Sequence, residues 1–85
     1  MWRLPLSPEL EKQIEGDVAD IKNTGGRAGG AITAALFLQH FNEGLPWAHL
    51  DIAGATRQDK ATALGPKGAT GYGVRTLLHY LMREA

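Results

Sequence analysis

The sequence contains no cysteine, and its formal net charge is zero. Among 85 residues, 9 are basic and 9 are acidic. Without cysteine, neither a disulfide nor a thiolate zinc site can form. Modules that bind nucleic acid or membrane surfaces carry a basic excess, which this chain lacks. The longest apolar stretch, Ala34 to Leu38, is far shorter than the roughly 20 residues of a membrane-spanning helix. These absences favour a soluble, globular protein without nucleic-acid or membrane partners.

The short length limits the core that the chain can build. A chain of 85 residues forms one small domain at most, and it buries only about 60–65% of the surface that it exposes when unfolded. We therefore treat residues 1–85 as a single piece without an internal boundary. We expect its core to be marginal.

Three helices are predicted. Ser7 followed by Pro8 is typical of a helix start, with Ser as the cap and Pro in the first position, and this helix should end near Gly16. A second helix should cover residues 31–41. The third follows the last glycines and carries apolar residues at helical spacing, namely Val74, Leu77, Leu78 and Leu81.

The second helix and the predicted strand both need more cover than this chain offers. Residues 28–38 contain no charged residue, so the second helix has no charged face. A helix that is apolar all round belongs in the interior of a large protein. Residues 47–54 indicate a strand, whereas residues 17–22 permit a short strand or an extended segment. A single strand leaves backbone groups unpaired, so the rest of the sheet should come from outside the chain.

Two glycine-rich stretches resemble nucleotide-binding loops, but the residues around them do not fit such loops. Gly25 and Gly30 have the spacing of a phosphate-binding loop, but Ala31 and Ile32 follow where Lys and Ser or Thr are required. The segment 67–73 follows a polar loop rather than a strand, unlike a dinucleotide loop. Close backbone packing is the favoured role of these glycines.

Histidines and acids in the sequence fit no compact metal motif. His40 and His79 are predicted on helix surfaces, and His49 is predicted to be an interior, hydrogen-bonded residue. Asp51 interrupts an apolar segment, where a carboxylate needs a partner. That partner is either a backbone amide of a nearby loop or a basic residue such as Arg27.

Four blocks of sequence carry a resemblance to a known family. They are Trp-Arg-Leu-Pro-Leu at 2–6, Ala-Asp-Ile-Lys-Asn-Thr-Gly-Gly-Arg at 19–27, Trp-Ala-His-Leu-Asp-Ile-Ala-Gly at 47–54, and Lys-Gly-Ala-Thr-Gly at 67–71. In order and spacing they resemble the C-terminal end of the leucyl (cytosol) aminopeptidase family, over essentially the whole chain.

This resemblance implies a metal-dependent enzyme that removes N-terminal residues from peptides in the cytoplasm. It implies two divalent ions, zinc or manganese, and a homohexamer. The implied α/β fold is a three-layer α/β/α sandwich around a mixed sheet. The present chain would supply part of it, about three helices and one or two strands.

The same resemblance assigns no catalytic or metal-binding role to any residue here. The family's Asn-Thr-Asp-Ala-Glu-Gly-Arg motif, which supplies two carboxylate ligands and the catalytic arginine, does not occur in this sequence. The resemblance does imply that Thr24, Ala53 and Thr56 line the pocket for the substrate's N-terminal side chain. Two threonines predict a somewhat more polar and smaller pocket than one built from large apolar residues.

Two hypotheses follow about the chain's partners. In the first, the partners are the remainder of the catalytic domain and peptide substrates. In the second, the chain is a free-standing module that assembles with itself or with another chain, without catalytic activity. A small phosphate- or nucleotide-binding protein is a third alternative.

Overall fold

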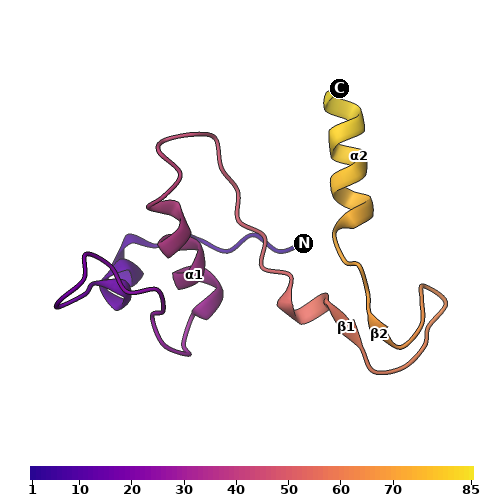
Figure 1. The fold of residues 1–85 in the computed structure, drawn as a ribbon, viewed down its shortest axis with the longest axis horizontal. Coiled ribbons are helices and arrows are strands. Elements are labelled where there is room, and N and C mark those ends of the chain that lie inside the picture. The colour runs from indigo at the N-terminus through magenta and orange to yellow at the C-terminus, as the bar shows by residue number, and fades with distance from the viewer. The chain divides into compact units, whose positions relative to one another are not determined.

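Short helices alternate with glycine-rich turns along the chain (Figure 1). The computed structural model describes residues 1–85. In chain order the elements are η1 (Pro8–Ile14), α1 (Gly30–Gln39), η2 (Ala53–Ala55), β1 (Arg57–Gln58), β2 (Gly68–Ala69) and α2 (Val74–Glu84). They group into two units, Met1–His49 and Leu50–Ala85, which are described separately below.

The first helix begins where the sequence predicts but is a 3-10 helix. Pro8 occupies its first turn, and the Ser7 hydroxyl donates a hydrogen bond to Glu9 Oε2 at 3.0 Å. After Ile14, residues 15–22 form a loop. The Lys22 N–H closes this loop by donating a hydrogen bond to the Ile14 carbonyl at 2.6 Å. Residues 17–22 therefore contribute one isolated bridge rather than a strand.

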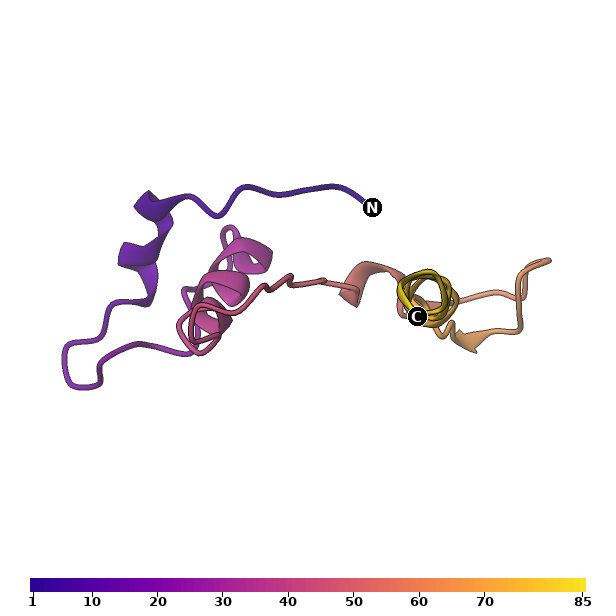
Figure 2. The ribbon, with the colours of Figure 1, turned by 90° about the horizontal axis from the view of Figure 1, so that it is seen from above.

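The core of the first unit lies where η1 packs against α1 (Figure 2). Ile14 of η1 and Leu36 of α1 are 1% and 2% exposed, and Thr33 and Ala35 are buried beside them. The opposite side of α1 is not covered, since Leu38 is exposed. One face of an apolar helix is therefore buried and another faces solvent, as expected for a helix that needs additional partners.

The second unit contains a small hairpin that the sequence did not reveal. β1 pairs with β2 in antiparallel register, with Arg57 opposite Ala69 and Gln58 opposite Gly68. The Gln58 Nε2 group donates to the carbonyls of Gly65 and Pro66 at 2.8 and 2.6 Å. This side chain therefore ties the connecting loop to the strand.

The strand predicted at residues 47–54 is not formed. Residues 45–52 have no regular secondary structure, and η2 begins at Ala53. None of the backbone N–H groups of residues 47–52 donates a hydrogen bond. A strand is defined by its neighbours, and this chain supplies none to these residues.

The predicted C-terminal helix is confirmed as α2, and its apolar side is uncovered. Gly73 caps it with a φ of 94°, and no residue of α2 is buried. Leu77 and Leu81 are 48% and 63% exposed. The structure therefore contains helices and a two-stranded antiparallel sheet, and its few buried residues lie in the first unit. None of its helices combines the length and apolar character needed to cross a membrane.

Candidate functional site

Two of the three predicted pocket residues, Ala53 and Thr56, lie on the same turn. The Thr56 hydroxyl donates to the Ala53 carbonyl at 3.1 Å. The Ala53 N–H donates to Asp51 Oδ1 at 3.1 Å, a local side-chain turn that Asp favours. For Asp51, the backbone-amide alternative is therefore confirmed. We call residues 51–56 the pocket turn.

Thr70 attaches the pocket turn to the segment that leads into α2. Its backbone N–H donates to the Thr56 carbonyl at 2.9 Å, and its hydroxyl donates to the Ala55 carbonyl at 2.5 Å. The same hydroxyl oxygen accepts the Tyr72 N–H at 3.2 Å. Thr70 was not among the predicted site residues, because no local sequence signal distinguishes it within residues 67–71.

Thr24, the third predicted pocket residue, belongs to the first unit. Its hydroxyl oxygen accepts a hydrogen bond from the Gly26 N–H at 3.4 Å, and its side chain is exposed. Gly25, which follows it, packs closely against Thr33 of α1. The structure thus brings Ala53 and Thr56 together and describes Thr24 separately.

The hydroxyls of the two threonines are used differently. Thr56 donates its only hydroxyl hydrogen to Ala53, so toward a ligand it offers a methyl group and oxygen lone pairs. Thr24 accepts from Gly26 and retains its hydrogen for donation. Such groups can contact and orient a side chain.

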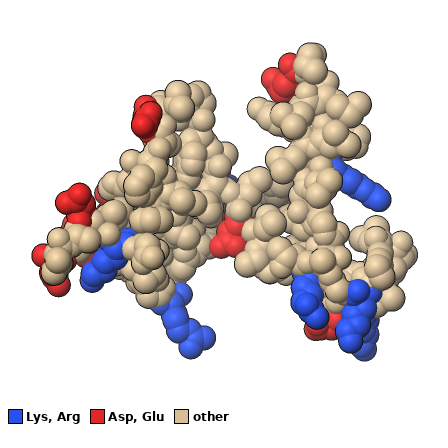
Figure 3. Space-filling view, viewed as in Figure 1, with Lys and Arg blue, Asp and Glu red and all other residues tan.

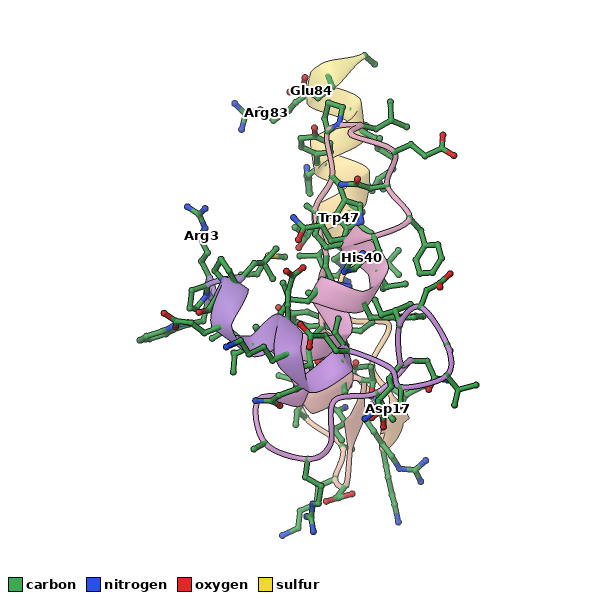
Figure 4. All side chains as sticks on the ribbon, turned by 90° about the vertical axis from the view of Figure 1, so that its left-hand side faces the viewer. Arg3, Asp17, His40, Trp47, Arg83 and Glu84 are labelled. Carbon is green, nitrogen blue, oxygen red and sulfur yellow. The ribbon has the colours of Figure 1, made fainter.

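The chain's histidines and acids do not assemble a metal site. No group of three or more His, Asp or Glu residues lies close enough together to hold an ion. His40, labelled in Figure 4, is exposed as predicted. Its Nε2 atom lies 3.4 Å from Glu11 Oε1. The two divalent ions that the resemblance implies therefore do not fit the residues of this chain.

The other two histidines occupy different environments. His79 is exposed on α2, as predicted. His49 is only half-buried, and it lies beside Trp47 with ring centroids 6.2 Å apart. The prediction of a hydrogen-bonded interior His49 was wrong, because its side chain is only partly buried and forms no hydrogen bond within this chain.

Basic side chains gather around the hairpin of the second unit (Figure 3). Arg57, Lys60 and Lys67 lie on β1 and on the connecting loop, and Asp59 lies among them; all four are exposed. No ion pair joins these residues. The charged side chains of the hairpin therefore face solvent.

The amino-acid sequence of this chain is similar to those of known proteins. The profile of the cytosol aminopeptidase family, catalytic domain, matches residues 1–78. The chain therefore belongs to the cytosol aminopeptidase family. A probable cytosol aminopeptidase of Synechococcus sp. (strain WH7803) is 54% identical over 100% of this chain and 17% of its own length. One of Syntrophotalea carbinolica is 55% identical over 99% of this chain and 17% of its own length.

Solved structures support the same assignment. A mutant tomato leucine aminopeptidase is 44% identical and superposes with a TM-score of 0.83, over 96% of this chain and 15% of that chain. The bottromycin maturation enzyme BotP in complex with Mn is 45% identical, with a TM-score of 0.88, over 98% of this chain and 19% of that chain. The chain thus spans about 17% of the length of the curated relatives it matches.

Proposed function

We propose that this chain is the C-terminal part of the catalytic domain of a metal-dependent aminopeptidase that releases N-terminal amino acids from peptides. The observation that carries the proposal is the family match over residues 1–78 by a chain that spans about 17% of its relatives. In the complete enzyme the chain contributes part of the sheet core and of the substrate-pocket wall. The metal ligands and catalytic groups lie in the remainder of the domain.

Two uncovered features of the chain, residues 47–52 and α2, support the proposal that it is one part of a larger catalytic domain. Residues 47–52 have backbone N–H groups without partners, and α2 presents uncovered leucines. Unpaired backbone and exposed apolar faces are unfavourable unless another part of the protein covers them. The remainder of an α/β/α catalytic domain would cover both, by extending the sheet at residues 47–52 and by packing on α2.

The pocket proposal rests on the pocket turn and on Thr24. From the family resemblance we infer that Ala53 and Thr56 line the pocket for the substrate's N-terminal side chain, and that Thr24 lines it as well. Because Thr56 shows a methyl group and an acceptor oxygen, we expect a preference for small to medium side chains. Large apolar side chains would be accepted less readily than in a pocket lined by large apolar residues.

The complete enzyme would hold two divalent ions, manganese or zinc, and act as a cytoplasmic homohexamer. The solved BotP structure contains Mn, which supports manganese for this enzyme too. Such ions activate a bound water and stabilise the developing oxyanion. The residues of this chain contribute to binding and orienting the peptide's first side chain, and they hold neither ion.

The decisive experiment compares the complete protein with the 85-residue chain. Both are purified, treated with a chelator, and assayed with leucine p-nitroanilide before and after addition of Mn²⁺ or Zn²⁺. We expect metal-restored hydrolysis by the complete protein and none by the chain alone. Hydrolysis by the isolated chain, free of contaminating peptidase, would overturn the proposed division of roles, and an inactive metal-loaded complete protein would overturn the proposed activity.

A second candidate is a free-standing module that assembles with itself or with a partner. The uncovered face of α2 favours it, since two such faces can cover each other. Sedimentation and circular dichroism of the 85-residue chain distinguish the two. A folded, monodisperse oligomer supports the module, whereas a poorly folded or aggregating chain supports the fragment of an enzyme.

A further inference from the structure

Thr70 makes the side-chain hydrogen bond that joins the pocket turn to a distant part of the chain. Fifteen residues separate it from Ala55, whose carbonyl accepts its hydroxyl hydrogen at 2.5 Å. Its backbone N–H reaches the Thr56 carbonyl at 2.9 Å. Two adjacent carbonyls of the turn are therefore held by one residue.

The other hydrogen bonds of the pocket turn are local. The Ala55 N–H donates to the Ile52 carbonyl at 2.9 Å, and the hydroxyl of Thr56 and the carboxylate of Asp51 bond to Ala53. These bonds fix the shape of the turn but not its position relative to the segment that precedes α2. That position depends on Thr70 and on the two-residue pairing of β1 with β2.

The chemistry at Thr70 requires a hydroxyl. Its hydrogen goes to the Ala55 carbonyl, while its oxygen accepts the Tyr72 N–H at 3.2 Å. A hydroxyl can donate and accept at once, whereas a methyl group can do neither. Thr70→Ser keeps the hydroxyl and therefore both of its hydrogen bonds, whereas Thr70→Val keeps only the shape of the side chain. Comparing the two variants separates the effect of hydrogen bonding from that of side-chain size.

We propose that Thr70 is a positioning residue for the specificity pocket, holding the wall formed by Ala53 and Thr56 at a fixed distance from the substrate's first side chain. The proposal rests on the proposed function, because only an aminopeptidase would use this wall for that purpose. Thr70 itself need not touch substrate. A small displacement of a pocket wall changes how side chains of different size fit, and such fits govern discrimination.

The test uses the complete enzyme with Thr70→Val and Thr70→Ser, and with Thr76→Val as the matched control. Thr76 lies on α2, and its hydroxyl forms no hydrogen bond within this chain. The readout is the ratio of kcat/KM for leucine and alanine p-nitroanilides. We expect Thr70→Val to change this ratio by about tenfold, chiefly through KM, in line with the discrimination that one methylene provides.

The outcomes separate positioning from simple loss of stability. A general loss of folded enzyme lowers both activities equally and leaves the ratio unchanged. We expect Thr70→Ser and Thr76→Val to stay within about twofold of the unsubstituted ratio, well below the discrimination of one methylene. An unchanged ratio in Thr70→Val, or an equal change in Thr70→Ser, would overturn the proposal.

A second measurement does not depend on activity. Hydrogen exchange followed by mass spectrometry reports the peptide covering residues 51–58 in the same variants. We expect faster exchange there in Thr70→Val than in Thr70→Ser, with exchange of α1 unchanged. If the unsubstituted enzyme hydrolyses neither substrate, the proposed function fails by itself. Equal exchange of residues 51–58 in the two variants shows instead that Thr70 does not hold the turn.

Discussion

Gly25 lies directly against Thr33 of α1. A Cβ atom added at Gly25 would be 2.9 Å from Thr33 Cγ2 and 3.0 Å from its Cβ. Thr33 is buried, and its hydroxyl donates to the Gly30 carbonyl at 3.3 Å. The glycine-rich segment is thus pressed onto the helix that it precedes, and the predicted role of close packing is confirmed at Gly25.

We predict that Gly25→Ala destabilises the complete enzyme. The added methyl group overlaps a buried side chain that cannot swing away freely, and overpacking of this kind costs about 1–3 kcal/mol. The check is the thermal midpoint of unfolding, which should fall. Since Thr24 adjoins Gly25, KM should rise as well if Thr24 lines the pocket.

Two further variants serve as controls for Gly25→Ala. A Cβ at Gly30 meets nothing within 4 Å, so Gly30→Ala should be neutral or stabilising by up to about 1 kcal/mol. Thr33→Ser removes the Cγ2 atom that overlaps most closely. The double variant Gly25→Ala/Thr33→Ser should recover part of the loss, and strictly additive effects would show that this contact is not the cause.

Gly29 is required for its backbone conformation rather than for space. Its φ is 63° and its ψ is 28°, and a Cβ there meets nothing within 4 Å. We predict that Gly29→Ala costs about 1–2 kcal/mol, the usual penalty of the left-handed conformation, whereas Gly29→Asn costs less. Thermal unfolding of the two variants checks this. Equal midpoints for both would contradict the conformational explanation.

Local signals predicted the helices well. Pro8 and Ser7 mark the start of η1, and the stripe that begins at Val74 marks α2. The hairpin was not predicted, since β1 and β2 are two residues each and are held by pairing and by Gln58 across the loop. Such non-local hydrogen bonds leave no periodic pattern in the sequence.

Residues 47–54 were predicted to form a strand, but they do not form one in this chain. Their sequence pattern is that of a strand, but pairing needs neighbours that this chain does not contain. At the site, a backbone-amide partner for Asp51 was one of two predicted alternatives, because a carboxylate in an apolar segment needs a partner, and the Ala53 N–H is that partner. The role of Thr70 was not foreseen, since its partner carbonyls lie 14 and 15 residues away and only folding brings them together.

The apolar face of α2 gives a prediction about the remainder of the enzyme. If that remainder covers the face, Leu77→Ala should cost about 2–5 kcal/mol in the complete enzyme, as expected for a buried leucine. Arg75→Ala, on the same helix, should change stability by no more than about 0.5 kcal/mol. Thermal unfolding of both variants provides the comparison, and equal effects would show that Leu77 stays exposed.

The same leucine should matter little in the 85-residue chain, where it is already 48% exposed. We therefore expect Leu77→Ala to leave the circular dichroism of the isolated chain nearly unchanged while reducing any self-association measured by sedimentation. A folded oligomer that dissociates on this substitution would favour the free-standing module. Aggregation in both forms would favour the fragment.

Residues 47–52 provide the sharpest test of incompleteness. Their backbone N–H groups donate no hydrogen bonds in this chain, although their sequence is typical of a strand. In the complete enzyme, neighbouring strands would accept hydrogen bonds from these groups, and amide hydrogen exchange would then require local or global opening.

We predict that hydrogen exchange of residues 47–52 is fast in the isolated chain and slowed at least about 100-fold in the complete enzyme, because paired core strands open with free energies of several kcal/mol. Residues 59–61 of the exposed hairpin loop, whose N–H groups donate no hydrogen bond in this chain, are the internal control and should exchange quickly in both. Fast exchange of residues 47–52 in the folded, active enzyme would show that they are not a strand of its sheet.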